Sequence, residues 1–269
     1  MTNAIKTAIG AAALLLPSAA WAQEDGPRFC PSRPSLESSA CTTEPGRVQF
    51  EFSVADWTLD KTADERNDTI LGGDFLARFG VGKTTELQLS WTPVAYVRTR
   101  DKTTDEISRV ARPGDVRLAV RQNLANPDGK GLSYGVEPFV TLPVGRSPVG
   151  AGTWGGGAVL PVTYDVNDTV NVGFTGEMDA APDEDGHGRH FQYSGVAATS
   201  LQLTKALSLT VEGELIRDRD PLEHQTQALA GLGMLWTYSK TRAFYAEAIG
   251  GLNHDSPDVQ IYAGLAALF

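Results

Sequence analysis

The sequence predicts an all-β protein, a closed antiparallel transmembrane β-barrel of about twelve strands with short periplasmic turns and longer external loops. Three observations lead to this fold class. Apolar and polar residues alternate along most of the chain, the connections between the alternating segments are short and long in turn, and the last segment ends in an aromatic residue. Only helices and closed barrels satisfy all their backbone hydrogen bonds in lipid.

Residues 259–269 (VQIYAGLAALF) are predicted to form the closing strand. Every second residue, beginning with Val259 and ending with Phe269, is apolar, and the residues between them are small or polar except Leu268. This is the two-residue period of a strand. Such a strand with a terminal Phe resembles the closing strand of bacterial outer-membrane barrels, whose aromatic end is read by the assembly machinery. That resemblance implies the assembly machinery as a partner, bound through Phe269.

The N-terminus predicts a secretory signal peptide over residues 1–22. Lys6 precedes an apolar run at residues 8–16, Pro17 ends this run, and residues 20–22 (AWA) have the small-x-small pattern of a signal peptidase site. The run is too short to span a bilayer, and no later stretch approaches the ~20 apolar residues of a spanning helix. A membrane location must therefore be built from strands, and we expect the bacterial outer membrane.

Charge excludes one class of partner. The formal net charge is −10, and binding to nucleic acid needs clustered Lys and Arg to neutralise phosphates. We therefore expect no nucleic-acid partner.

Two cysteines, Cys30 and Cys41, lie in a Pro- and Ser-rich segment after the signal peptide. In an oxidising compartment, one local disulfide is the simplest use of two nearby thiols. A CxxC motif is absent, and Cys30 lies too far from the apolar run to be a lipoprotein cysteine. We expect residues 23–46 to form a disulfide-closed periplasmic segment, or a small plug folded into the lumen, and residues 47–269 to form the barrel.

The strands follow in order along the barrel region. In the first, Phe50 and Phe52 fall on one face while Gln49 and Glu51 fall on the other. The alternation predicts strands at residues 47–57, 70–79, 85–97, 115–124, 132–143, 154–166, 169–180, 190–203, 207–217, 226–238, 242–252 and 259–269. Their even number agrees with bacterial barrels. We expect the first and last strands to pair.

The connections between these strands alternate in length. Short turns are predicted at residues 80–84, 126–129, 167–168, 204–206 and 239–241. Longer polar loops are predicted at residues 58–67, 98–114, 145–153, 181–189, 218–225 and 253–258. Because outer-membrane barrels have short periplasmic turns and long external loops, both termini are expected in the periplasm.

Aromatic residues support the same orientation, since rings gather at the two membrane interfaces. Those near predicted periplasmic strand ends are Phe79, Tyr164, Trp236, Tyr238, Phe244 and Phe269, and those near external ends are Trp57, Tyr96, Trp154 and Phe191. A soluble β-sandwich or lipocalin-like barrel also alternates. The loop asymmetry and the terminal Phe favour the membrane barrel.

Four segments carry a family resemblance: FCPSRPSLESSACTTEPGRVQFEFSVADWTLD, EPFVTLPVGRSPVGAGTWGGGAVLPVTYDV, DEDGHGRH and GLNHDSPDVQIYAGL. Together they resemble a group of transporter-like proteobacterial outer-membrane proteins known as phenol-degradation meta-pathway proteins. Residues 141–145 (TLPVG) with the Gly-rich loop after them are the most specific mark. The resemblance implies an outer-membrane barrel, sometimes encoded near aromatic catabolism, and supplies no catalytic or binding residues.

The inner face is where polar residues can influence permeation, because the lipid face cannot hold them. Extending the alternation inward gives eleven lumen-lining candidates: Glu51, Glu86, Asp115, Arg117, Arg121, Glu137, Glu177, Asp179, Glu212, Glu214 and Glu247. This mostly acidic set fits a filter that favours cations or neutral solutes over anions. It also fits a narrow barrel filled by internal ion pairs.

The histidines fall in or beside the predicted external loops, and residues 183–190 (DEDGHGRH) combine two of them with acids. Metal or acid–base chemistry is open to such groups, yet a solvated acidic loop that bridges lipopolysaccharide through divalent ions fits better. His190 and Ser194 share a strand face, but the sequence shows no third group to orient them. We therefore expect no enzyme, cofactor or bound metal.

We expect an outer-membrane channel or transporter for small, hydrophobic or aromatic solutes, in contact with lipid and lipopolysaccharide. The solute class rests on the family resemblance alone. The alternatives are a non-transporting structural or surface barrel with a filled lumen and, third, a hydrolase at the barrel rim.

Overall fold

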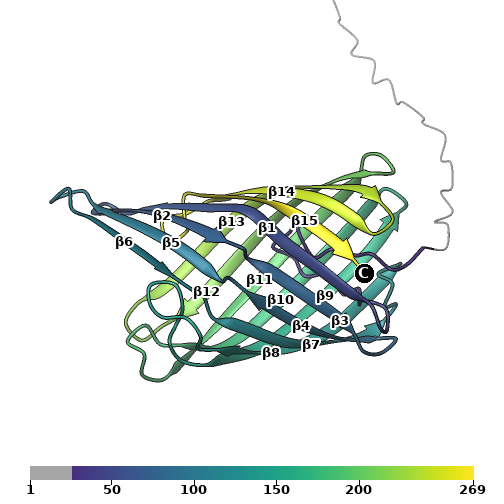
Figure 1. The fold of residues 1–269 in the computed structure, drawn as a ribbon, viewed down its shortest axis with the longest axis horizontal. Helices are drawn as coiled ribbons and strands as arrows, with labels where there is room; N and C mark the ends of the chain where they lie inside the picture. Colours follow the sequence, from purple (N-terminus) through teal and green to yellow (C-terminus); the bar gives the residue numbers. More distant parts are fainter. Residues whose placement is uncertain (1–25) are drawn as a thin grey trace, which may run out of the picture.

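The computed structural model describes residues 26–269 and shows a closed antiparallel barrel of twelve strands with three extra strands at one end (Figure 1). The signal peptide predicted over residues 1–22 lies outside the described residues. The strands are β1 (Val48–Lys61), β2 (Glu65–Gly72), β3 (Phe75–Gly80), β4 (Thr85–Trp91), β5 (Val94–Asp101), β6 (Ile107–Arg112), β7 (Val116–Ala125), β8 (Leu132–Leu142), β9 (Gly155–Asn167), β10 (Val170–Pro182), β11 (Arg189–Gln202), β12 (Leu207–Arg219), β13 (His224–Ser239), β14 (Arg242–Gly251) and β15 (Val259–Leu268).

The barrel wall runs in the order β15-β14-β13-β12-β11-β10-β9-β8-β7-β4-β3-β1 and closes where β1 pairs with β15. The register of this seam runs from Gln49 opposite Leu268 to Leu59 opposite Val259. At its end the Phe269 N–H donates to the Val48 carbonyl over 2.8 Å. The predicted pairing of first and last strands is therefore confirmed, and no wall edge is left at the seam.

The barrel is apolar outside and polar inside, as the alternation predicts. On β12 the outward Val211 is 57% exposed, whereas its neighbour Glu212 is 4% exposed. On β15 Ile261 and Leu265 point outward, while Tyr262 is buried inside. This inside-out pattern suits a wall that meets lipid on its outer face. Within residues 26–269, no helix has the length and apolar character to cross a membrane.

The barrel has two unlike ends. We call one the short-turn end, where residues 81–84, 126–131, 168–169, 203–206 and 240–241 connect the strands. We call the other the long-loop end, where residues 143–154, 183–188, 220–223 and 252–258 do so. The predicted aromatic group at the short-turn end is compact, because Phe244 lies 5.7 Å from Trp236 and 4.8 Å from Tyr238, ring centre to ring centre.

The predicted loops at residues 58–67 and 98–114 are wrong in detail. They are largely strand: β1 runs on to Lys61, and β2, β5 and β6 form a sheet that projects from the long-loop end (Figure 1). Because these strands are mostly polar, their sequences resemble those of loops. A sheet that projects into water can form its backbone hydrogen bonds without burying an apolar face. Gly73, with φ +74°, and Pro93 break the two predicted strands where wall becomes projection.

Candidate functional site in the barrel lumen

Residues 28–43 cross the lumen. Their backbone and side chains bond to β1 through Glu51 and to β10 through Thr175, and these two strands lie on opposite sides of the ring. A segment that reaches both sides of a closed barrel must run inside it. The predicted disulfide between Cys30 and Cys41 is present within this segment. We call residues 28–43 the inner segment.

One side of the lumen binds the inner segment through a buried network of charges on β3, β4, β7 and β8. Arg78 donates to Glu86 over 2.9 Å, and Arg121 donates to Glu137 over 2.7 Å. Arg121 also lies 3.5 Å from Glu86, so the charges alternate in sign around the group. All four side chains are at most 5% exposed. Such charges are tolerated in a protein interior because each has opposite partners.

Arg78 joins this network to both ends of the disulfide loop. Its guanidinium donates to the carbonyl of Cys30 over 2.6 Å and to that of Cys41 over 2.7 Å. Glu51 accepts the amides of Ser32 and Arg33 at 3.0 and 2.9 Å. The backbone of the inner segment therefore replaces the water that these buried charges would otherwise bind.

Another side of the lumen, on β14 and β15 next to the seam with β1, is mostly apolar. Tyr245 and Ile249 of β14 pack with Tyr262 and Ala266 of β15, and the ring centres of the two tyrosines lie 6.1 Å apart. Four partly buried residues pack against this cluster: Phe29, Leu36, Leu229 and Leu235. Phe29 and Leu36 belong to the inner segment, which thus has a polar side toward β3, β4, β7 and β8 and an apolar side toward β13–β15. We call this cluster the apolar wall.

Three further acidic candidates gather near the middle of the barrel. Glu212 accepts the Ser35 hydroxyl at 2.5 Å and the Leu36 amide at 2.8 Å. Glu247 is 2% exposed and accepts the Tyr262 hydroxyl. Glu214 is only partly buried and hydrogen-bonds Ser194. Of these three, Glu212 binds the inner segment directly.

A third group lies toward the long-loop end. Arg117 donates to Glu177 over 3.0 Å and stacks 3.5 Å from the centre of the Phe139 ring. Asp179 shares a hydrogen bond with Glu177. Asp115 is apart from the other candidates, because it accepts the amides of Gly145 and Ala151 and fixes the β8–β9 loop.

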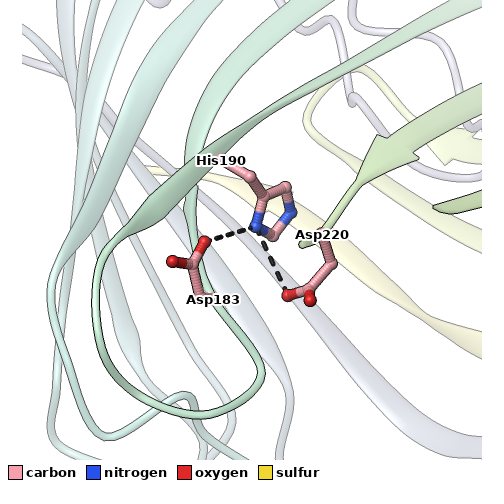
Figure 2. A group of neighbouring side chains, drawn as sticks. All are labelled: Asp183, His190 and Asp220. Atoms are coloured by element: carbon pink, nitrogen blue, oxygen red, sulfur yellow. Dashed lines mark hydrogen bonds and ion pairs between the residues drawn. The ribbon is translucent and has the colours of Figure 1, made fainter. Parts of the chain in front are cut away.

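At the rim of the long-loop end, His190 lies among carboxylates from two different loops (Figure 2). Its Nδ1 is 3.0 Å from Asp183 and 3.5 Å from Asp220, and its Nε2 is 2.8 Å from Asp218. Backbone amides of Leu222 and Glu184, with the nearby His190, hold the pKa of the Asp220 carboxyl below its usual value. The sequence showed no third group beside His190 and Ser194, but the structure places Asp218 and Asp220, remote in sequence, next to the His190 ring.

Sequence reasoning missed two features of the lumen. Arg78 was not among the predicted lumen-lining residues, although its neighbour Phe79 points outward and Arg78 must therefore point inward. An inward Arg near several inward acids indicates an internal ion pair. Nothing in the sequence indicated that His190 and Asp220 lie together. They meet because β11 and β12 are paired neighbours in the barrel wall, which brings their loops together.

The fold, the outward apolar surface and the polar interior define a transmembrane β-barrel of the outer-membrane class. Residues 32–269 match the family described as "Putative MetA-pathway of phenol degradation", and the chain belongs to that family. The resemblance found in the sequence is thereby confirmed. No curated protein matches the sequence.

Solved outer-membrane barrels are similar in fold. An outer-membrane channel from Pseudomonas putida F1 superposes with a TM-score of 0.69 and 10% identity, covering 86% of this chain and 98% of that one. The transport unit of the autotransporter AIDA-I from Escherichia coli gives 0.52 and 10% identity, over 89% and 92% of the two chains. The KdgM porin in complex with oligogalacturonate gives 0.51 and 9% identity, over 83% and 99%. At these identities the likeness concerns the fold.

Proposed function

We propose that this barrel is an outer-membrane channel for small, neutral, hydrophobic or aromatic solutes, constricted by the inner segment. The observation that carries the proposal is the two-sided lumen. A phenol-like solute has an apolar ring and a polar hydroxyl. When the inner segment moves off the apolar wall, the wall can contact the ring, and Tyr245 and Tyr262, whose hydroxyls bond Ser53 and Glu247 in this structure, can exchange those partners for the solute hydroxyl. The family description, which refers to phenol degradation, supports the same solute class.

Two measurements test the channel. In planar bilayers the full chain should give a small conductance, and proteoliposomes should take up a neutral aromatic such as benzyl alcohol in a saturable manner. Changing Ile249→Ser should weaken the aromatic uptake, because it removes apolar surface from the wall, and should leave swelling in arabinose unchanged. The matched control is Ile107→Ser on the projecting strand β6, where the side chain is 40% exposed. Equal uptake by both variants would contradict the assignment of the apolar wall.

The second candidate is a non-transporting barrel with a filled lumen, and the buried charge network favours it at the short-turn end. Here Glu86, Arg121 and Glu137 would serve as internal ion pairs together with Arg78, and no acidic filter would exist at this end. Deleting residues 28–43 separates the two functions. A channel should conduct far more after the deletion than before it, whereas a structural barrel whose own side chains fill the lumen should conduct in neither form.

The proposal includes the orientation of the barrel. With the short-turn end and both termini in the periplasm, the long-loop end faces outward, where acidic loops can meet lipopolysaccharide and its divalent ions. A cysteine placed at Asn253 should react with an impermeant maleimide on intact cells, and one placed at Lys240 should not. The reverse pattern would invert the assignment.

We also propose that the chain is not an enzyme. His190 and Ser194 are four residues apart on β11, which separates them by about 13 Å along the strand. Ser194 hydrogen-bonds Glu214 instead. A nucleophile and its base need hydrogen-bond contact. Esterase activity that disappears in both Ser194→Ala and His190→Ala variants would contradict this.

A further inference from the structure

We propose that His190, Asp183 and Asp220 form a binding site for a divalent ion of the zinc class, which joins two loops of the long-loop end. The proposal is independent of the channel function. His190 lies at the start of β11, Asp183 in the loop after β10 and Asp220 in the loop after β12, and each offers one ligand atom within 4.8 Å of the others (Figure 2).

The spacing of the ligand atoms suits a small cation. Nitrogen and oxygen ligands lie about 2.0–2.2 Å from zinc, so neighbouring ligands of a tetrahedral site are roughly 3.3–3.6 Å apart. His190 Nδ1 is 3.0 Å from the Asp183 oxygen and 3.5 Å from the Asp220 oxygen. Little movement would bring all three ligands onto one ion.

Charge and burial favour a cation at the same point. Asp183, Asp218 and Asp220 surround one imidazole, and among the ion pairs of residues 26–269 His190 is their sole cationic partner. The three carboxylates outnumber the single imidazole. The His190 side chain is only 7% exposed, so the group is shielded from solvent. A divalent ion would balance these charges.

The surroundings of His190 have the form expected around a metal ligand. A ligating histidine usually gives its second ring nitrogen to a carboxylate. Nε2 is buried and lies 2.8 Å from Asp218, but in an orientation that makes no regular hydrogen bond. Gln192 fixes the other Asp218 oxygen at 2.9 Å. Asp218 is thus a positioning residue for His190, and a small rotation of the ring would complete the bond.

The ligand set selects among ions. A nitrogen ligand with two carboxylates suits zinc and similar first-row ions, whereas magnesium and calcium prefer oxygen ligands alone. A pocket of about 370 Å³ borders the cluster at His190.

Zinc titration of the full chain, folded in detergent with magnesium in excess, tests the site. The native barrel should bind one equivalent of zinc, and His190→Ala and Asp183→Asn should each bind it at least tenfold more weakly. Asp183→Asn keeps the side-chain shape, and heat-modifiable gel migration of each variant reports folding separately. The control is His187→Ala, because His187 is in the same loop but 90% exposed.

A second readout uses cobalt in place of zinc, since its visible absorption reports nitrogen and oxygen ligands in a low-symmetry site. The native barrel and His187→Ala should show this absorption, and His190→Ala should lose it. Zinc binding equal in all the variants, or lost in His187→Ala, would overturn the proposed ligand set. No zinc uptake by the folded native barrel would overturn the site itself.

Discussion

Replacing Arg78 by Met tests whether the charge network holds the inner segment in the lumen. Arg78 is fully buried, donates to Glu86, and binds the carbonyls of Cys30 and Cys41. Met fills similar space but donates nothing, so Glu86 would keep only Arg121, at 3.5 Å, as its charged partner. Breaking a buried pair from one side costs about 3–5 kcal/mol. The lost bonds to two carbonyls act in the same direction.

The free energy of unfolding can be measured by urea titration of the barrel in detergent, followed by tryptophan fluorescence. Protease cleavage within residues 28–43 reports release of the inner segment separately, and conductance should rise when it is released. Adding Glu86→Gln to Arg78→Met should recover part of the stability, because the unpaired carboxylate is removed. Arg66→Met is the control, since Arg66 pairs with Asp68 on the projecting sheet. Equal cleavage of Arg78→Met and Arg66→Met would refute the reasoning.

Three more predictions concern the seam, the disulfide and a close backbone contact. Deleting Phe269 should lower the amount of folded barrel in the outer membrane several-fold, measured by heat-modifiable gel migration, because the last seam hydrogen bonds are lost. Replacing Cys30 and Cys41 by Ser should increase conductance and protease cleavage of the inner segment, because its loop is no longer closed. Gly80→Ala should destabilise the barrel by about 1–3 kcal/mol in urea titrations, since overpacking forces shifts. A Cβ there would overlap the Glu44 carbonyl oxygen.

Each of these has a matched comparison. Phe191→Ala removes an exposed ring from the other end of the barrel and should assemble normally, so an equal defect would deny Phe269 a special role. Reductant added to the native chain should reproduce the cysteine variant. Gly250→Ala meets no atom within 4 Å; if it were as harmful as Gly80→Ala, the contact with Glu44 would not be the cause.

The barrel could be predicted from the sequence because a wall between lipid and lumen imposes one rule on every strand. Phe50 and Phe52 meet the outside while Gln49 and Glu51 meet the inside, and the same rule pairs the two ends of the chain. This alternation of apolar and polar residues is lost in the strands that project beyond the barrel wall. On β6, outside the wall, nearly every residue is exposed, so no alternation marks Ile107–Arg112 as a strand.

For the candidate site, the sequence predicted which side chains point into the lumen but not which of them contact one another. The alternation of residues along each strand showed that Glu86 and Arg121 point inward. Their contact, however, depends on the pairing of β4 with β7, which are separated in sequence by the projecting hairpin and which place Glu86 opposite Arg121. The path of the inner segment has no periodic signal, since the segment forms no strand and many of its hydrogen bonds are made by backbone groups. The resemblance to a family indicated a barrel without indicating what occupies it.

The way Arg78 binds both ends of the disulfide loop has a consequence for the time course of any opening. Cys30 and Cys41 are covalently joined and share this one guanidinium, so we expect the release of one end to be coupled to the release of the other. Release of the inner segment must then be a cooperative event with a high barrier, because buried charges have no intermediate partners. Single-channel recordings should show abrupt steps between long-lived levels, with dwell times lengthening steeply on cooling, and no gradual drift of current.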